Sequence, residues 1–231
     1  MKKIGVLLSG CGVYDGVEIH EAVITLLALD RNGAEAICMA PDTEQYHVVN
    51  HLNGETSDEK RNVLVESARI ARGNIKDVKT VNASDIDGLI MPGGFGAAKN
   101  LSNFALKGKD ADIHPDVAKI VRDMVDAGKP VGAICIAPAV LSKIVEEKNP
   151  EVTIGNDFGT IETIEEIGGT HVVCSVDQIH VDHTNKLITT PAYMLGPGIK
   201  EVATGIEKLV AAVLKLSLLP LLIFYKMEYV L

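Results

Sequence analysis

The sequence predicts an α/β fold with a doubly wound, mostly parallel sheet and helices on both of its faces. Short apolar runs alternate with amphipathic or apolar helical stretches along the chain, which is the pattern of a series of βαβ units. The 231 residues contain no internal repeat and no linker rich in Pro, Gly or Ser. We therefore expect a single domain over residues 1–217, followed by an apolar tail over residues 218–231.

Strands are expected where apolar or β-branched runs lie between turn residues. The expected strands are residues 4–8, 34–39, 88–91, 131–134, 152–154, 171–174, 179–181 and 187–190. The polar turn at residues 183–186 joins the last two runs, so they are predicted to form an antiparallel hairpin at one edge of the sheet.

Helices are expected between the strands, at residues 17–31, 59–72, 97–104, 115–127, 138–147, 160–166 and 199–216. Several of them have recognisable ends. Pro115 opens one helix and Gly128 follows its last residue, while Thr56 and Glu59 have the spacing of a capping box at the start of another. The polar stretches 41–57 and 105–114 are interpreted as additions to the basic fold.

Composition and charge exclude several classes of partner. The chain has 31 acidic and 22 basic residues, a net charge of −9, and no basic run, so neither nucleic acid nor an anionic membrane surface is expected to bind. No apolar run is long enough to span a membrane, and the apolar run at the N-terminus is too short for a secretion signal.

The cysteines are isolated from one another. Cys11, Cys38, Cys135 and Cys174 form no CxxC pair and no cluster with metal-ligand spacing, so no metal site is expected. Isolated thiols favour a reducing compartment, and we predict a cytoplasmic location. The glycines of the loop at residues 9–16 have one residue too many for a dinucleotide-binding fingerprint, so no cofactor is expected.

Cys135 stands at the end of an apolar strand and directly before a predicted helix. Ala133 and Ala137 flank it and Pro138 follows, which is the pattern of a nucleophile elbow, where a sharp turn requires small neighbours. A helix N-terminus at this point favours the thiolate. The alternative is a buried structural cysteine in an apolar core. The glycine loop at residues 91–96 is either an anion or oxyanion site or an ordinary tight turn.

The string Ala-Ile-Cys-Ile-Ala-Pro around Cys135, the Met-Pro-Gly-Gly loop before it and Glu21 in Glu-Ala-Val-Ile together resemble the ThiJ/PfpI superfamily. Its members have a flavodoxin-like, class I glutamine amidotransferase-like fold. Longer strings, among them Pro-Gly-Gly-Phe-Gly-Ala-Ala-Lys-Asn, resemble the isoprenoid biosynthesis glyoxalase branch of that superfamily. The resemblance covers residues 1–217.

The resemblance implies roles for individual residues. Cys135 would be the nucleophile and Glu21 its carboxyl partner, and the N–H groups of Gly94 and Ile136 would form an oxyanion hole. Residues 18, 21 and 25 fall in one polar sector of an apolar helix, which faces either a site or solvent. Burial of Glu21 against Cys135 would raise the pKa of the carboxyl.

Two further residues are expected at the same edge of the sheet. Gly93 lies beside the expected oxyanion hole, and Cys11 is either a second site thiol or a small loop-filling residue.

The resemblance implies a glutathione-independent glyoxalase, a lyase that converts methylglyoxal or glyoxal to a hydroxy acid, and together with the apolar tail it implies a homodimer. The activity is expected to be weak, because no histidine stands at position 136, 155 or 193. The alternative function is a non-enzymatic redox sensor or regulatory protein, linked to isoprenoid metabolism, in which Cys135 is oxidised reversibly. Peptidase and glutaminase activities are not expected, because the late segment Thr-Pro-Ala-Tyr-Met lacks the histidine base that they need. His180 and His183 are interpreted as surface residues, and His20 points about 100° away from Glu21 on its helix.

Overall fold

The computed structural model describes residues 1–218, and its centre is a sheet of seven strands. Their order is β10 (His180–Asp182), β11 (Leu187–Thr190), β7 (Val131–Ile134), β6 (Gly88–Met91), β1 (Lys3–Leu7), β2 (Glu35–Ala40) and β5 (Lys76–Asp77). Only β10 runs antiparallel to its neighbour, and the other pairs are parallel. The predicted fold class and the edge hairpin are therefore confirmed.

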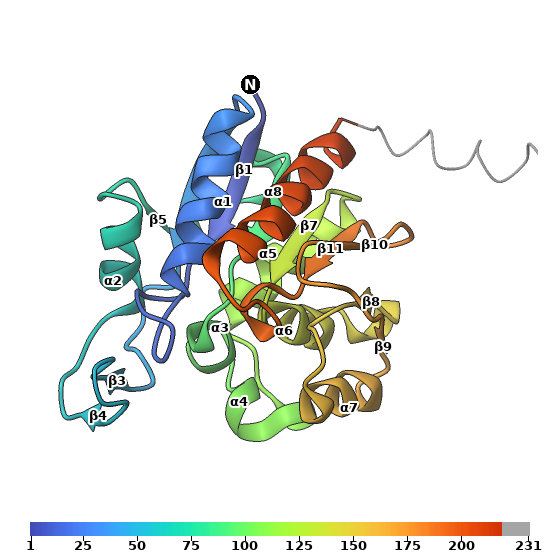
Figure 1. Cartoon of the computed structure of the whole chain (residues 1–231). Helices are drawn as coiled ribbons and strands as arrows, with labels where there is room; N and C mark the ends of the chain where they lie inside the picture. The colour runs from blue at the N-terminus through green and yellow to red at the C-terminus, as the bar shows by residue number, and fades with distance from the viewer. Residues whose placement is uncertain (219–231) are drawn as a thin grey trace, which may run out of the picture.

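Helices cover both faces of the sheet (Figure 1). The longest pair, α1 (Ile19–Arg31) and α8 (Ile199–Leu216), packs together on one face. The other helices are α2 (Val63–Ile70), α3 (Phe95–Lys99), α4 (Phe104–Lys107), α5 (Pro115–Asp126), α6 (Ala137–Ile144) and α7 (Phe158–Glu166). Short 3-10 turns are η1 (Val78–Thr80), η2 (Ala83–Asp85), η3 (Gly108–Asp110), η4 (Glu146–Lys148) and η5 (Ala192–Met194).

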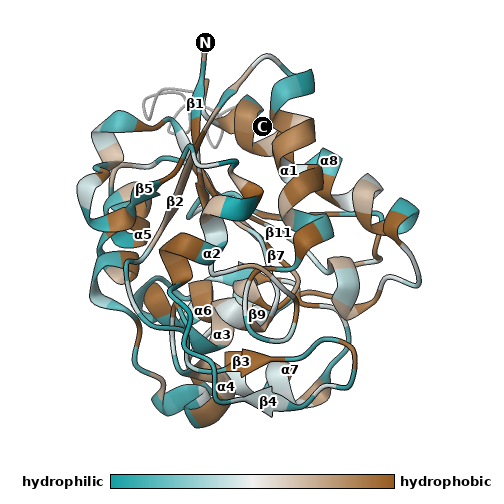
Figure 2. Ribbon diagram, turned by 90° about the vertical axis from the view of Figure 1, so that its left-hand side faces the viewer, coloured by the Kyte–Doolittle hydropathy of each residue, from teal (hydrophilic) through white to brown (hydrophobic). Residues whose placement is uncertain are grey.

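Each face of the sheet has its own apolar core, because the side chains of a strand alternate between the two faces. In β1, Ile4 and Val6 belong to the core shared with α1 and α8, whereas Leu7 belongs to the core shared with α5 and α6. Apolar residues cover α1 on nearly all sides, and this helix is drawn mostly in brown in Figure 2. The few polar residues of α1 are therefore candidates for a specific role.

The predicted helix at residues 59–72 begins later than expected. The structure starts α2 at Val63, where the side chain of Asn62 accepts the N–H of Val65 at 3.0 Å. Thr56 is not a cap: it belongs to β4 (Thr56–Ser57), which pairs with β3 (Val48–Val49) inside the polar stretch 41–57. The hairpin thus includes the predicted cap residue, and residues 59–62 lead into the helix outside regular structure, with Asn62 in an isolated bridge to Glu44.

Other predicted elements also differ in extent. The helix expected at 97–104 is divided into α3 and α4, and between them Asn100 donates its side-chain amide to the carbonyls of Ser9 and Asp15. The strands expected at 152–154 and 171–174 shorten to β8 (Glu151–Val152) and β9 (Thr170–His171), which form a separate parallel pair. The expected apolar tail lies outside the described residues from position 219 onward. In residues 1–218, no helix combines the length and the hydropathy required to cross a membrane.

Candidate active site

Cys135 occupies a sharp turn between β7 and α6. Its φ of +64° lies in the left-handed region, which a residue other than glycine adopts only under strain. The N–H of Cys135 donates to the carbonyl of Thr190 at 3.0 Å, and only 8% of the residue is exposed. Its small neighbours Ala133 and Ala137 are completely buried. This geometry is that of a nucleophile elbow.

Glu21 reaches the same point from α1 and is completely buried. Its Oε2 accepts the N–H of Gly93 at 2.9 Å, and its Oε1 accepts the N–H of Tyr193 at a longer 3.4 Å. The carboxyl also shares a hydrogen bond with the thiol of Cys135. The structure therefore brings together the two side chains that the resemblance paired, although they are far apart in the sequence.

The turn after β6 supplies the backbone of the site. A Cβ on Gly93 would lie 2.5 Å from the Cβ of Cys135 and 2.7 Å from Oε2 of Glu21, so a side chain at this position would displace both groups. Gly94 has a φ of +91°, and its N–H and that of Ile136 donate to the sulfur of Cys135. The predicted oxyanion-hole donors thus point at the sulfur. An oxyanion on a carbon bonded to this sulfur would lie next to the same two N–H groups.

The surroundings of Glu21 favour its neutral form. Burial and the charge of Glu18 raise its pKa from 4.5 to about 8, against the opposing effect of the hydrogen bonds from Gly93, Tyr193 and Cys135. Glu18 lies one turn earlier, is 8% exposed, and accepts the N–H of Glu21 at 2.7 Å as the N-cap of α1. The predicted rise in the pKa of Glu21 is confirmed, and the polar sector of α1 faces inward.

The thiol of Cys135 differs from the expectation. Burial and the charge of Glu21 raise the pKa of Cys135 well above 9, while the N–H groups of Gly94 and Ile136 lower it. The argument from the helix N-terminus considered only the second effect. The sulfur and the carboxyl are therefore best described as a pair of acids that share a proton, in which ionisation of one disfavours ionisation of the other.

This raised pKa makes the stability of the protein depend on pH. Glu21 keeps its proton up to about pH 8 in the folded state but loses it near pH 4.5 when unfolded. Between these values the folded state binds more protons, so the free energy of unfolding falls as the pH rises from 4.5 to 8. At neutral pH this loss is on the order of a few kcal/mol. We expect Glu21→Gln, which never ionises, to melt several degrees above the wild type at pH 8.

Circular-dichroism melts at pH 4.5 and pH 8 measure this effect. The matched control is Glu162→Gln, because Glu162 is an exposed carboxyl on α7. The control should melt with the wild type at both pH values. A Glu21→Gln variant that also follows the wild type at both would contradict the assigned pKa.

Cys11 does not join the Cys135 pair. It is half-buried, and the charges that act on its thiol belong to Glu66, Arg69, Asp15 and Arg61. The pKa of Cys11 is raised, chiefly by burial. The loop that carries Cys11 nevertheless supports the site, since the N–H of residue 95 donates to the carbonyl of residue 13 at 2.8 Å, beside Gly94.

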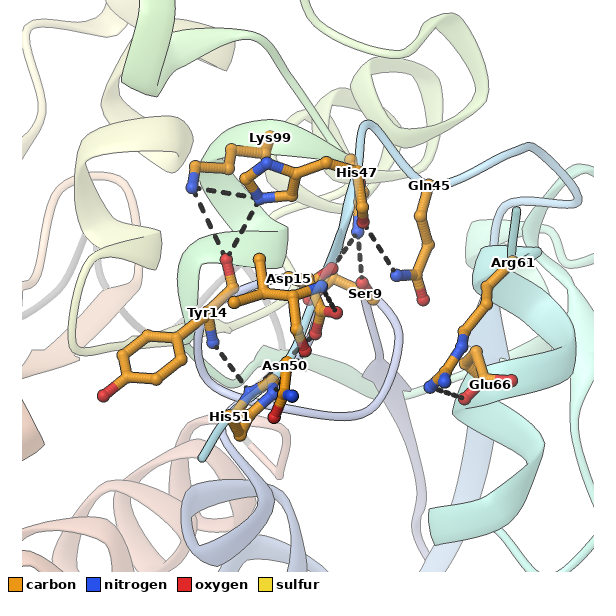
Figure 3. Close-up of polar contacts among 12 residues, drawn as sticks. Ser9, Tyr14, Asp15, Gln45, His47, Asn50, His51, Arg61, Glu66 and Lys99 are labelled. Carbon is orange, nitrogen blue, oxygen red and sulfur yellow. Dashed lines mark hydrogen bonds and ion pairs between the residues drawn. The ribbon is translucent and has the colours of Figure 1, made fainter. Parts of the chain in front are cut away.

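The polar stretch 41–57 closes over this loop (Figure 3). The N–H of Tyr14 donates to Nε2 of His51 at 3.2 Å, and the carboxylate of Asp15 accepts the N–H of Val49 at 2.7 Å. Lys99 lies 3.4 Å from the carbonyl of Tyr14. The stretch 41–57 thus holds the loop after β1 in contact with α3, the helix that follows the turn at residues 93 and 94.

Of the three histidines considered in the sequence, only His180 differs from its prediction. His183 is exposed, as expected. His180 was expected at the surface but has a side chain only 18% exposed, with Nε2 3.4 Å from Oε2 of Glu151. His20 does point away from Glu21, yet its Nδ1 lies 2.7 Å from the hydroxyl of Tyr193.

Sequence reasoning therefore missed the pair formed by His20 and Tyr193. The sequence did place Tyr193 in the late segment where related enzymes have a histidine base, and this position could have marked the tyrosine as a site residue. In residues 1–218, no cluster of three or more His, Cys, Asp or Glu side chains has an arrangement that could hold a metal ion.

Comparisons with known proteins agree with this geometry. The model of the DJ-1/PfpI family matches residues 11–189. The human glutamine amidotransferase-like class 1 domain-containing protein 3, mitochondrial, is 45% identical over 225 residues, which cover 93% of this chain and 83% of that protein. An isoprenoid biosynthesis protein with an amidotransferase-like domain from Ehrlichia chaffeensis is 38% identical, with a TM-score of 0.88 over 94% of this chain and 99% of that one. Glyoxalase III from Candida albicans shares the fold, with a TM-score of 0.59 and 17% identity over 92% of this chain and 97% of that one.

The curated relatives contradict one prediction. They are named mitochondrial proteins, whereas the isolated cysteines were interpreted as a sign of a cytoplasmic location. That inference was wrong because unpaired thiols indicate reducing conditions and do not identify the compartment that provides them.

Proposed function

Because this chain belongs to the DJ-1/PfpI family, we propose that it is a glutathione-independent glyoxalase, a lyase that acts on small 2-oxoaldehydes such as methylglyoxal and glyoxal. The observation that carries the proposal is the sulfur of Cys135, which meets one buried carboxyl and two backbone N–H donors. Reaction of a carbonyl substrate requires a nucleophile, a proton carrier and a site for negative charge. The sulfur, the carboxyl and the two N–H groups can supply them in that order.

The first step is addition of the sulfur to the aldehyde carbon of methylglyoxal. A C–S bond forms, the carbonyl π electrons move to oxygen, and the thiol proton passes to the carboxylate of Glu21. The N–H groups of Gly94 and Ile136 stabilise the oxygen while it is negative. Glu21 then gives the proton to this oxygen, which yields a hemithioacetal and restores the carboxylate.

The second step moves hydrogen from one carbon to the next. The carboxylate of Glu21 removes the proton of the former aldehyde carbon, and the electron pair forms an enediolate with its negative charge on the ketone oxygen. Glu21 returns the proton to the neighbouring carbon, while the hydroxyl proton of the former aldehyde carbon passes to the ketone oxygen. The product is a thioester of lactate on Cys135. Water adds to the thioester carbon, Glu21 takes one proton from this water, and the C–S bond breaks as Glu21 gives that proton to the sulfur. In total, methylglyoxal and one water give lactic acid, and no external oxidant or reductant is needed.

Peptidase and glutaminase activities are not part of the proposal. These reactions require a histidine that takes the proton of the thiol, and Glu21 is the side chain that does so in this site. The late segment places Tyr193 near the carboxyl instead. A single carboxyl as proton carrier supports weak activity on reactive aldehydes rather than hydrolysis of amides.

The test is production of lactate from methylglyoxal by the full chain without glutathione. The wild type should form lactate in proportion to the protein added, and reduced glutathione should not increase the rate. Absence of lactate above the protein-free rate would overturn the proposal and favour the redox-sensing alternative. The isoprenoid biosynthesis branch is also a proposal, supported by the relative from Ehrlichia chaffeensis that carries this name.

We also propose a homodimer in which α1 contributes to the contact between copies. Three apolar residues one turn apart on this helix, Ile19, Val23 and Leu27, are 42%, 47% and 43% exposed. Such a stripe on the outer side of a surface helix is typical of a contact with another protein surface. Sedimentation at micromolar concentration should show a dimer, and Val23→Lys should shift it toward monomer. A wild type that sediments as a monomer would contradict the proposal.

A further inference from the structure

The contact between His20 and Tyr193 joins two segments that are 173 residues apart. Nδ1 of His20 lies 2.7 Å from the hydroxyl of Tyr193, and the two rings are tilted with centroids 5.8 Å apart. This distance is that of a well-formed hydrogen bond. Both residues lie at the rim of the site, where His20 is exposed and Tyr193 is half-buried.

Tyr193 also contacts the buried carboxyl through its backbone. Its N–H donates to Oε1 of Glu21 at 3.4 Å, which is long for such a bond. The preceding residue, Ala192, has a φ of +44° and is completely buried, so η5 reaches Glu21 through a strained residue. Backbone hydrogen bonds within residues 191–196 hold the turn itself, so a contact of the Tyr193 side chain acts mainly on how closely its N–H approaches Glu21.

We propose that the His20–Tyr193 hydrogen bond is a tether that holds the backbone N–H of Tyr193 against Glu21 and thereby favours ionisation of the Glu21 carboxyl. His20 and the Tyr193 hydroxyl are positioning groups, because they act on Glu21 through the backbone of η5. Their consequence for turnover rests on the proposed function, whereas their effect on the proton does not.

The groups that face Glu21 make the sign of the effect clear. Glu18 on α1 and the sulfur of Cys135 at the elbow disfavour a second negative charge beside them, and the N–H groups of Gly93 and Tyr193 favour one. Nδ1 of His20 also lies 3.9 Å from Oε1 of Glu18, so the imidazole can act on Glu21 through Glu18 as well as through Tyr193. Loss of the tether weakens the hydrogen bond from Tyr193. The carboxyl then keeps its proton to a higher pH.

The test is a titration that does not depend on catalysis. The infrared band of the protonated Glu21 carboxyl, identified by its loss in Glu21→Gln, is followed against pH in the full chain. In Tyr193→Phe, the N–H remains and only the hydroxyl is lost, and we expect the midpoint to rise by about half a pH unit to one pH unit. His20→Ala, a change at an exposed residue, should raise it by a similar amount.

The double variant separates a tether from an effect of histidine charge. If His20 and Tyr193 act through one hydrogen bond, the double variant shifts the midpoint no further than either single variant. Additive shifts, or an unchanged midpoint in Tyr193→Phe, would overturn the inference. The control is Tyr46→Phe, since Tyr46 is 55% exposed and its bond to Asn100 uses the backbone N–H. In this variant the titration midpoint of Glu21 should equal that of the wild type.

These outcomes are distinct from failure of the proposed function. A wild type that forms no lactate but shows the expected non-additive shifts would refute the glyoxalase and leave the tether intact. Lactate formation by the wild type, together with an unchanged midpoint in Tyr193→Phe, would support the glyoxalase and refute the tether. If the glyoxalase activity and the tether are both correct, the pH at which turnover is half-maximal should rise in Tyr193→Phe and in His20→Ala by the same amount as the titration midpoint of Glu21.

Discussion

Replacement of Cys135 by serine should reduce lactate formation from methylglyoxal to the protein-free rate, a loss of about 10³-fold or more. The hydroxyl of serine is a much weaker acid than a thiol, and the site offers only the carboxyl of Glu21 to remove its proton. The two N–H donors at the sulfur position would remain in place, but they stabilise an oxyanion only after a nucleophile has added.

Cys174→Ser is the matched control for this variant. Cys174 is half-buried at a distance from the elbow in the sequence, and its thiol hydrogen-bonds the carbonyl of the next residue. The control should retain wild-type turnover, and melting curves should show that both variants fold. Substantial lactate formation by folded Cys135→Ser would refute covalent catalysis at this residue.

Glu21→Gln should lower turnover nearly as far, by about 10²–10⁴-fold, because one carboxyl carries the proton through every step of the proposed mechanism. Glutamine keeps the shape of the side chain and can still accept the N–H of Gly93, but it cannot take a proton from the thiol. With the pKa of Glu21 at about 8, wild-type turnover should rise as the pH increases through that value, since the carboxylate is the active form. This rise should be absent in the variant.

Steady-state rates from pH 6 to 9, with the protein-free rate subtracted, measure both effects. Glu207→Gln is the control, because Glu207 pairs with Arg31 on the outer side of the α1–α8 contact and both side chains are at least half exposed. It should keep the wild-type profile. Full activity of Glu21→Gln, or an unchanged pH profile, would show that another group moves the proton.

Local patterns in the sequence were sufficient for the fold and for the elbow. The strands at 88–91, 131–134 and 187–190 and the helix at 199–216 have the predicted bounds, because each is an apolar run bounded by residues that end it. Cys135 was recognisable for the same reason, since the small residues required by the turn stand next to it in the chain.

Interactions between distant segments were not accessible in this way. The helical pitch correctly placed His20 away from Glu21, but it carried no information about Tyr193, which approaches from η5 at the other end of the chain. The state of Cys135 depended likewise on burial and on Glu21, and the local pattern showed only the helix N-terminus. The start of α2 was misplaced because the capping-box spacing of Thr56 and Glu59 was taken without the competing β3–β4 hairpin.

The two carboxyls at the start of α1 also bear on substrate selectivity. Glu18 and Glu21 are almost completely buried within one helical turn, so the interior of the site becomes more negative when Glu21 ionises, and the ionised carboxyl is the active form in the proposed mechanism. A substrate with its own carboxylate or phosphate would enter this region against repulsion, and its charge would lose hydration without gaining a cation. An uncharged dicarbonyl avoids both penalties. In the proposed reaction, these two buried acids would therefore discriminate against keto acids and phosphorylated sugars, even where their carbonyl groups have the right shape.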